Sequence, residues 1–171
     1  LFAGCSAGTE KQVASPQPSQ RGALGDATLG YAQVMASKSI DGAPITEDSR
    51  ATAMVVFASW CGHCRKELAV LAQLREKYPD LRIIGLNAYE DYNDFSDQER
   101  LRKYISENAP WLTEIVHADQ AMLTSFGKVP KIPTLFLYNG KGEVIAEYRR
   151  GKTSPPSPAE LDAAIARSLG R

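Results

Sequence analysis

Cysteine and histidine are both scarce in this sequence. The 171 residues contain three cysteines and two histidines. Cys61 and Cys64 lie close together, and the third cysteine, Cys5, lies far away near the N-terminal end. Because no second cysteine pair exists, a zinc site built on Cys-x-x-Cys is disfavoured, and we expect no metal. Two cysteines so close together close a small ring, which suits a switchable disulfide better than a structural one.

Net charge and long apolar runs are also lacking. Twenty basic residues balance twenty acidic residues, so no field of one sign attracts nucleic acid, and we expect no nucleic-acid partner. No run approaches the ~20 apolar residues that a membrane span needs. The composition, 43% hydrophobic and 23% charged, is typical of a globular protein, and the length suggests one domain with an attached tail.

The stretch Trp60–Cys64 contains the cysteine pair and lies between two regular patterns. Before it, Ala53–Phe57 is short, apolar and rich in strand-forming residues. After it, apolar residues recur at helical spacing, namely Leu68, Leu71, Leu74 and Tyr78. The cysteines are therefore predicted in the first turn of a helix, where unpaired N–H groups and the helix dipole favour the reactive thiolate.

The rest of the chain alternates strand and helix patterns. Strand, helix and strand over about 36 residues from Ala53 predict a βαβ unit with parallel strands. Two later strand patterns flank the turn 139–142, which predicts a hairpin. The further elements expected are strands at 81–87, 114–117, 134–138 and 143–148, and helices at 62–77, 96–108, 119–126 and 159–169.

Two stretches are less regular. Over 23–51, Leu29, Val34 and Met35 fit a short helix or an irregular lead-in, and 40–45 resembles a tight turn between two short strands. The stretch 88–95 is acidic and aromatic but lacks the complete ligand pattern of a calcium loop. We expect a solvated loop there.

The N-terminal residues suggest where in the cell the protein is located. Ala3 and Gly4 before Cys5 resemble a bacterial lipoprotein signal, in which the cysteine takes the lipid, although Phe2 replaces the usual aliphatic residue. The chain starts without Met, so we expect a longer precursor. The next residues, to about Gly22, lack apolar bulk. Residues 1–22 are therefore predicted as a lipobox remnant and flexible tether, and 23–171 as the folded domain; the alternative is a merely disordered end with a stray cysteine.

Two segments resemble a known family, and each occurs at the matching place in the order of elements. They are Phe57–Leu68 and Phe126–Thr134. Together they resemble the thioredoxin superfamily and, within it, the TlpA-like membrane-tethered thiol–disulfide oxidoreductases, over about 40–169. The resemblance implies an α/β thioredoxin-like fold, in which helices flank a central mixed β-sheet.

The resemblance also assigns roles to single residues. It implies that Cys61 is the exposed nucleophile and that Cys64 resolves the mixed disulfide. It implies a cis peptide bond between Ile132 and Pro133, which would place the Ile132 backbone beside the cysteines as a pairing partner for an extended substrate. Trp60 is expected to form a platform beside the site. Many relatives carry a small residue where this chain has Lys131.

Three further residues keep two interpretations each. His63 is either a solvated spacer or a group that stabilises the Cys61 thiolate and favours the reduced form. Glu67 is either a proton carrier, as in TlpA-like proteins, or a surface residue paired with a nearby cation. Thioredoxin has a buried Asp where this chain has Val55, so Glu67 is the nearby carboxylate candidate. His117 is expected in the core or on an edge strand.

Together these patterns predict an enzyme. The expected function is thiol–disulfide exchange with protein substrates through Cys61 and Cys64, needing no cofactor, with the direction of electron flow undecided. The expected partners are protein thiols or disulfides and a membrane or soluble redox partner. The expected location is the periplasmic side of a bacterial cell envelope, with a lipid anchor on Cys5. The alternative from another class is a thioredoxin-like module that binds partner proteins without catalysis.

Overall fold

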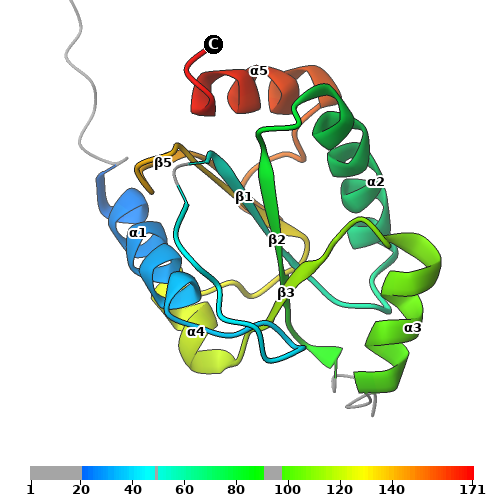
Figure 1. Ribbon diagram of the computed structural model, residues 1–171. Helices are drawn as coiled ribbons and strands as arrows, with labels where there is room; N and C mark the ends of the chain where they lie inside the picture. The colour runs from blue at the N-terminus through cyan, green and yellow to red at the C-terminus, as the bar shows by residue number, and fades with distance from the viewer. Residues whose placement is uncertain (1–20, 49, 91–97) are drawn as a thin grey trace, which may run out of the picture.

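The computed structural model describes residues 21–48, 50–90 and 98–171 (Figure 1). Its centre is a five-stranded mixed sheet in the order β3-β2-β1-β4-β5. The strands are β1 Thr52–Phe57, β2 Arg82–Asn87, β3 Glu114–His117, β4 Thr134–Tyr138 and β5 Val144–Arg149. The helices are α1 Arg21–Met35, α2 Gly62–Lys77, α3 Gln98–Asn108, α4 Gln120–Ser125 and α5 Pro158–Ser168.

The sheet is mixed because its two halves are connected differently. β1, β2 and β3 run parallel, joined by crossovers that contain α2 and α3. β4 runs antiparallel to both β1 and β5, and a short turn closes the β4–β5 hairpin with an Asn139 N–H to Glu143 carbonyl bond of 3.0 Å. Every residue of β1, β2 and β4 is buried. This matches the unbroken apolar runs within them, 53–57, 83–86 and 135–137, which are typical of strands covered on both faces.

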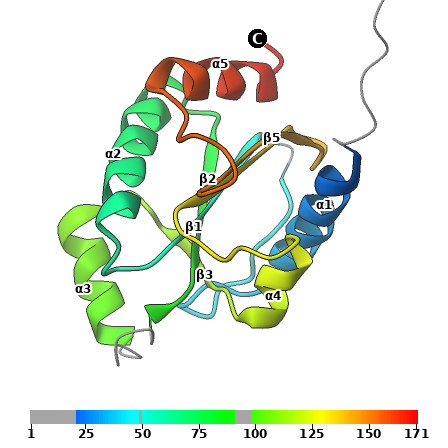
Figure 2. The same ribbon diagram turned by 180° about the vertical axis from the view of Figure 1, so that it is seen from behind.

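Helices cover both faces of the sheet. Figures 1 and 2 show α1 and α4 on one side of the strands and α2 and α3 on the other. α5 packs against β4 and β5, and Asp162 on it accepts a 2.7 Å bond from the Lys77 ammonium at the end of α2. The predicted thioredoxin-like α/β architecture is therefore confirmed.

α1 is a full helix and not an irregular lead-in. Ala27, Tyr31 and Val34 recur at helical spacing and are buried, whereas Leu29 is 64% exposed. Gly30 allows close packing on α4: a Cβ there would lie 2.5 Å from the Phe126 ring. The helix begins at Arg21, so the last two residues of the predicted tether belong to it. The rest of the tether, with Cys5, lies outside the described residues.

The tight turn predicted at 40–45 is present, but the two short strands expected around it are not formed by the described residues. The Ser39 N–H donates to the Ala43 carbonyl over 2.8 Å, and the Gly42 N–H donates to the Ser39 carbonyl over 2.9 Å. Lys38 and Pro44 form a single isolated bridge. This segment therefore crosses from α1 toward β1 without adding a strand to the sheet.

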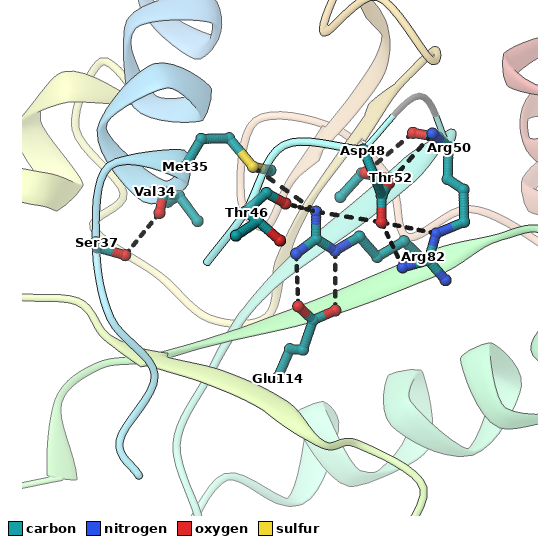
Figure 3. Close-up of polar contacts among 9 residues, drawn as sticks. All are labelled: Val34, Met35, Ser37, Thr46, Asp48, Arg50, Thr52, Arg82 and Glu114. Carbon is teal, nitrogen blue, oxygen red and sulfur yellow. Dashed lines mark hydrogen bonds and ion pairs between the residues drawn. The ribbon is translucent and has the colours of Figure 1, made fainter. Parts of the chain in front are cut away.

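A buried ion pair lies at the end of the sheet opposite to the cysteines. The Arg82 side chain is only 2% exposed and lies against Glu114 on the neighbouring strand, with an Nη2–Oε1 distance of 2.5 Å. A further 2.7 Å bond from Arg82 Nη1 to the Thr46 carbonyl joins the segment before β1 to β2 (Figure 3). The Glu114 carboxylate raises the pKa of Arg82, so this cation stays charged.

Candidate functional site

Three loops meet at the other end of the sheet. Phe57 at the end of β1 lies beside Asn87 at the end of β2, and Val56 lies beside Thr134 at the start of β4. The segments after β1, after β2 and before β4 are therefore brought together. This is the edge of an open α/β sheet at which sites are usually built.

Cys61 and Cys64 form a disulfide in the first of these loops, with Cα atoms 5.2 Å apart. Cys61 is the N-cap of α2, and its sulfur accepts the Cys64 N–H over 3.2 Å. The first turn of α2 contains no acidic residue. The prediction of two cysteines at the start of a helix is confirmed, and the N–H groups and dipole there favour a thiolate at Cys61 after reduction.

The two sulfurs differ in access, although less than predicted. Cys64 is fully buried, and Cys61 is 5% exposed, so Cys61 is not the openly exposed residue that was expected. Cys61 belongs to the buried hydrophobic cluster and is bonded to the fully buried Cys64. Cys61 lines a cleft of about 470 Å³, called here the cysteine cleft. The cleft is lined by Trp60, Cys61, Gly62, His63, Tyr89, Pro130, Lys131, Ile132 and Arg150.

Ile132 and Pro133 lie on the loop before β4. The peptide bond between them is cis, as predicted. Ile132 and Cys61 line the same cleft. Pairing of a substrate strand with Ile132 stays a prediction.

Tyr89 connects all three loops. Its carbonyl accepts the Trp60 indole N–H over 2.8 Å, and its hydroxyl donates to the Val129 carbonyl on the loop before β4. Burial raises the pKa of the Tyr89 hydroxyl, so it stays a proton donor. Trp60 is half-buried and lines the cysteine cleft, and its role as a platform stays a prediction.

Glu90 lies beneath the cysteine loop and corrects the prediction of a solvated loop for the described residues 88–90. It is only 8% exposed. Its carboxylate accepts the Ser59 N–H over 2.6 Å, the Ser59 hydroxyl over 2.7 Å and the Asn87 amide over 2.6 Å. The buried donors at the ends of β1 and β2 converge here, which draws Glu90 inward. Residues 91–95 lie outside the described residues.

Glu67 lies one turn beyond Cys64 on the same face of α2. It is half-buried, and its Oε1 atom is buried without a hydrogen-bond partner among the described residues. Burial raises its pKa. It lines a second cleft, of about 460 Å³, called here the proline cleft. The proline cleft is lined by His63, Lys66, Glu67, Pro133, Leu135, Tyr148, Arg150, Thr153, Ser154, Pro155 and Pro156.

The two histidines are separated. His63 is exposed and lines both clefts. His117 ends the edge strand β3 and is exposed, which confirms the edge-strand prediction. Val55 is fully buried in β1. Glu67 is the only carboxylate that lines either cleft among the described residues.

Arg150, which follows β5, is a residue of the site that no sequence motif marks. Its Nη1 atom donates to the Ile132 carbonyl over 3.3 Å, and it lines both clefts. Arg150 comes to the site only because β5 pairs with β4, with Arg149 opposite Thr134. An arginine after a strand gives no local signal of this.

The described residues contain no group of three or more His, Cys, Asp or Glu side chains placed to hold a metal ion. Within the same residues, no helix is long and apolar enough to cross a membrane.

Several solved structures are similar to this chain in fold. DsbF of MTB, solved in mixed oxidised and reduced forms, is 18% identical over 84% of this chain and 98% of its own, with a TM-score of 0.64. A secreted Mycobacterium tuberculosis disulfide oxidoreductase homologous to E. coli DsbE is 17% identical over 79% of this chain and 98% of its own, with a TM-score of 0.61. StoA from Bacillus subtilis is 26% identical over 74% of this chain and 92% of its own, with a TM-score of 0.54.

No curated protein sequence gives a significant match to the chain. The family model described as thioredoxin-like, by contrast, matches residues 49–144, more than half of the chain. That range contains both cysteines of the disulfide, Glu90 and the cis-proline loop. The chain therefore belongs to the thioredoxin-like family.

Proposed function

We propose that this protein is a thiol–disulfide oxidoreductase that exchanges disulfides with protein substrates. The single observation that carries the proposal is the Cys61–Cys64 disulfide, which caps α2 and lines a cleft together with Ile132. A disulfide that served only to staple the fold would not need to face a cleft beside a backbone segment able to pair with an extended chain.

The exchange needs no electron carrier beyond the two cysteines. In the reduced protein, the Cys61 thiolate attacks a substrate disulfide, forms a mixed disulfide and releases one substrate sulfur as a thiolate, which takes a proton. The Cys64 thiolate then attacks the Cys61 sulfur and releases the second substrate sulfur. The protein loses two electrons and two protons, and the substrate disulfide becomes two thiols. The same steps in reverse oxidise a substrate.

The site supplies the proton chemistry of these steps. The Cys61 sulfur accepts the Cys64 N–H at the start of α2, and this favours the thiolate that attacks. Glu67 has a pKa raised by burial and an Oε1 atom without a partner among the described residues. We assign Glu67 as the group that takes the proton from Cys64 when the mixed disulfide is resolved.

We further propose that the protein is TlpA-like and acts on the periplasmic side of a bacterial cell envelope, anchored by a lipid on Cys5. The small residues Ala3 and Gly4 before this cysteine support the anchor. A similar solved structure is described as a secreted disulfide oxidoreductase, which supports a place outside the cytoplasm. Acyl mass on Cys5 in the product of the native gene tests the anchor, and a Cys5→Ser variant that stays membrane-bound contradicts it.

Trapping distinguishes an enzyme from a binding module. The Cys64→Ser variant retains Cys61 but lacks the resolving thiol, so we expect it to accumulate mixed disulfides with a test disulfide protein. Cys61→Ser is the matched control and is expected to trap nothing. The proposal fails if Cys64→Ser forms no mixed disulfide and the wild type neither reduces nor oxidises the test protein.

A redox titration of the Cys61–Cys64 pair decides the direction of electron flow. Potentials near ~−270 mV are typical of thioredoxin, and potentials near ~−180 mV are typical of disulfide isomerases. A value near the first indicates a reductase, and a value near the second indicates an oxidase or isomerase. His63→Ala in the same titration tests whether His63 favours the reduced form, because loss of that effect would lower the potential.

A further inference from the structure

Two of the residues that line the cysteine cleft, Lys131 and Arg150, are cations without a carboxylate partner among the described residues. Arg150 makes one hydrogen bond among the described residues, from Nη1 to the Ile132 carbonyl. No ion pair involves Arg150 or Lys131 in the described part of the chain. No Asp or Glu is among the described residues that line this cleft. The buried arginines behave differently, because Arg82 and Arg149 both pair with glutamates.

Lys131 and Arg150 lie close together. Gly151 has a φ of +84°, and a Cβ on it would lie 3.1 Å from Lys131 Nζ. The Lys131 side chain therefore lies over the residue that follows Arg150. Two cations on one wall of a cleft create a positive potential there, which a bound anion relieves.

Arg150 is also placed at the reaction centre. Its guanidinium is bonded to the carbonyl of the residue before the cis proline, in the cleft that Cys61 lines. One N–H is used on Ile132, which leaves further donors in the planar fork that fits a carboxylate. A substrate strand beside Ile132 advances about 3.3 Å per residue. A side chain within about two residues of the substrate cysteine therefore reaches the guanidinium.

We propose that Arg150, with Lys131, selects protein segments that carry an Asp or Glu within about two residues of the reacting cysteine. This inference rests on the proposed thiol–disulfide exchange and names its substrate class. The occupant is an acidic peptide segment because the two cations lie beside a backbone segment that pairs with extended chains. The substrate carboxylate binds Arg150 while the Cys61 thiolate attacks the adjacent sulfur, and the electron balance of the exchange is unchanged.

Model peptides test the proposal directly. Symmetrical disulfide-linked dimers of one short peptide, with Asp, Asn or Lys on both sides of its cysteine, are mixed with the reduced protein, and release of peptide thiol is followed by chromatography. Each rate is divided by the rate of the same peptide with dithiothreitol, which removes the effect of the charges on the disulfide itself. We expect the normalised rate for Asp to exceed that for Asn about fivefold, with Lys slowest.

Two variants distinguish a specific effect of Arg150 on the Asp-to-Asn ratio from an effect of the protein's net charge. Arg150→Gln is expected to reduce the Asp-to-Asn ratio to about twofold or less, whereas Lys152→Gln, which removes one exposed charge that lines neither cleft, should keep the wild-type ratio. Unfolding curves check that both variants fold. In the wild type, raising the salt concentration to about 1 M should also reduce the ratio, because the Debye length falls to about 3 Å.

The outcomes separate the two proposals. If the wild type neither reduces the disulfide-linked peptides nor oxidises the corresponding peptide thiols faster than a protein-free blank, the proposed function fails, and the inference fails with it. If the wild type reduces the Asp and Asn peptides equally after normalisation, the selection by charge is wrong and the oxidoreductase stands. A ratio that Arg150→Gln leaves unchanged also overturns the assignment.

Discussion

Glu90 binds Ser59 twice, through the backbone N–H and the side-chain hydroxyl. Ser59 lies two residues before Cys61, and the Glu90 carboxylate is buried beneath it. These two hydrogen bonds hold in place the segment that leads from β1 to the disulfide. We therefore predict that Glu90→Ala destabilises the oxidised protein by about 3 kcal/mol, because three donors lose a charged acceptor and the Ser59 N–H stays buried. Chemical unfolding measures this.

The conservative variant makes the Glu90 prediction specific. Glu90→Gln keeps one acceptor oxygen, and the Ser59 hydroxyl can turn to accept from the new amide, so we expect a loss of about 1 kcal/mol. Ser59→Ala, which removes only the hydroxyl, should cost about the same. If Glu90→Ala unfolds at the same denaturant concentration as the wild type, or if Glu90→Gln is equally damaging, the contact does not hold the loop.

Glu67 gives the oxidised protein a defined pH dependence. Its pKa is raised in the folded state by burial, so between its ordinary and its raised pKa the folded state binds more protons than the unfolded state. Stability therefore falls as the pH rises through this window, and the loss persists above it. We predict that Glu67→Gln, which removes the titration, is more stable relative to the wild type at neutral pH than at pH about 4.

Catalysis supplies an independent readout of Glu67. If Glu67 carries the proton of Cys64, Glu67→Gln should slow resolution of the mixed disulfide more than its formation, in rapid-mixing experiments with a disulfide peptide. Glu76→Gln, on the same helix but lining neither cleft, is the matched control. If Glu67→Gln slows formation and resolution of the mixed disulfide equally, or slows neither step, Glu67 does not carry the proton of Cys64.

The sequence predicted the elements that carry strong local signals. The Cys61 and Cys64 spacing, the apolar run of β1 and the helical stripe after it are all local, and each was found where expected. The cis bond before Pro133 came from family resemblance, because no local pattern distinguishes it from the far commoner trans bond. α1 was the weakest prediction because its apolar stripe is formed by small and aromatic residues such as Ala27 and Tyr31.

The residues that the sequence did not reveal are placed by tertiary pairing. Glu90 looked like one carboxylate of a solvated loop, and only the donors gathered at the ends of β1 and β2 explain its burial. Arg150 reaches Ile132 only through the antiparallel register of β4 and β5. Both depend on residues distant in the sequence, so patterns of hydrophobicity and charge along one segment do not contain them.

Arg82 tests the buried ion pair at the far end of the sheet. Arg82→Met removes a cation that is 2% exposed and bonded to Glu114 and Thr46, so we expect a loss of about 3 kcal/mol in the free energy of unfolding. Arg50→Met is the control, because Arg50 pairs with Asp48 but is 50% exposed, and such a pair contributes about 0–1 kcal/mol. Similar losses of stability in the two variants would contradict the prediction that the buried ion pair contributes more than the exposed one.

Gly30 tests the packing of α1 on α4. Alanine favours a helix interior by about 1 kcal/mol over glycine, so helix propensity alone predicts that Gly30→Ala stabilises the protein. The added Cβ would lie 2.5 Å from the ring of Phe126, which is fully buried and stacked on Phe136 with centroids 4.7 Å apart. Moving the buried Phe126 ring away from the added Cβ would disturb its packing on Phe136. We therefore predict a net loss of about 1–2 kcal/mol by overpacking, measured by chemical unfolding of the oxidised protein.

Gly62→Ala is the matched control. Gly62 lies at the start of α2 with no atom within 4 Å of its Cβ position, so the change in stability should be less than about 0.5 kcal/mol. If Gly30→Ala is more stable than the wild type, the packing between α1 and the Phe126 ring can relax enough to accept the added methyl group, and the prediction is wrong.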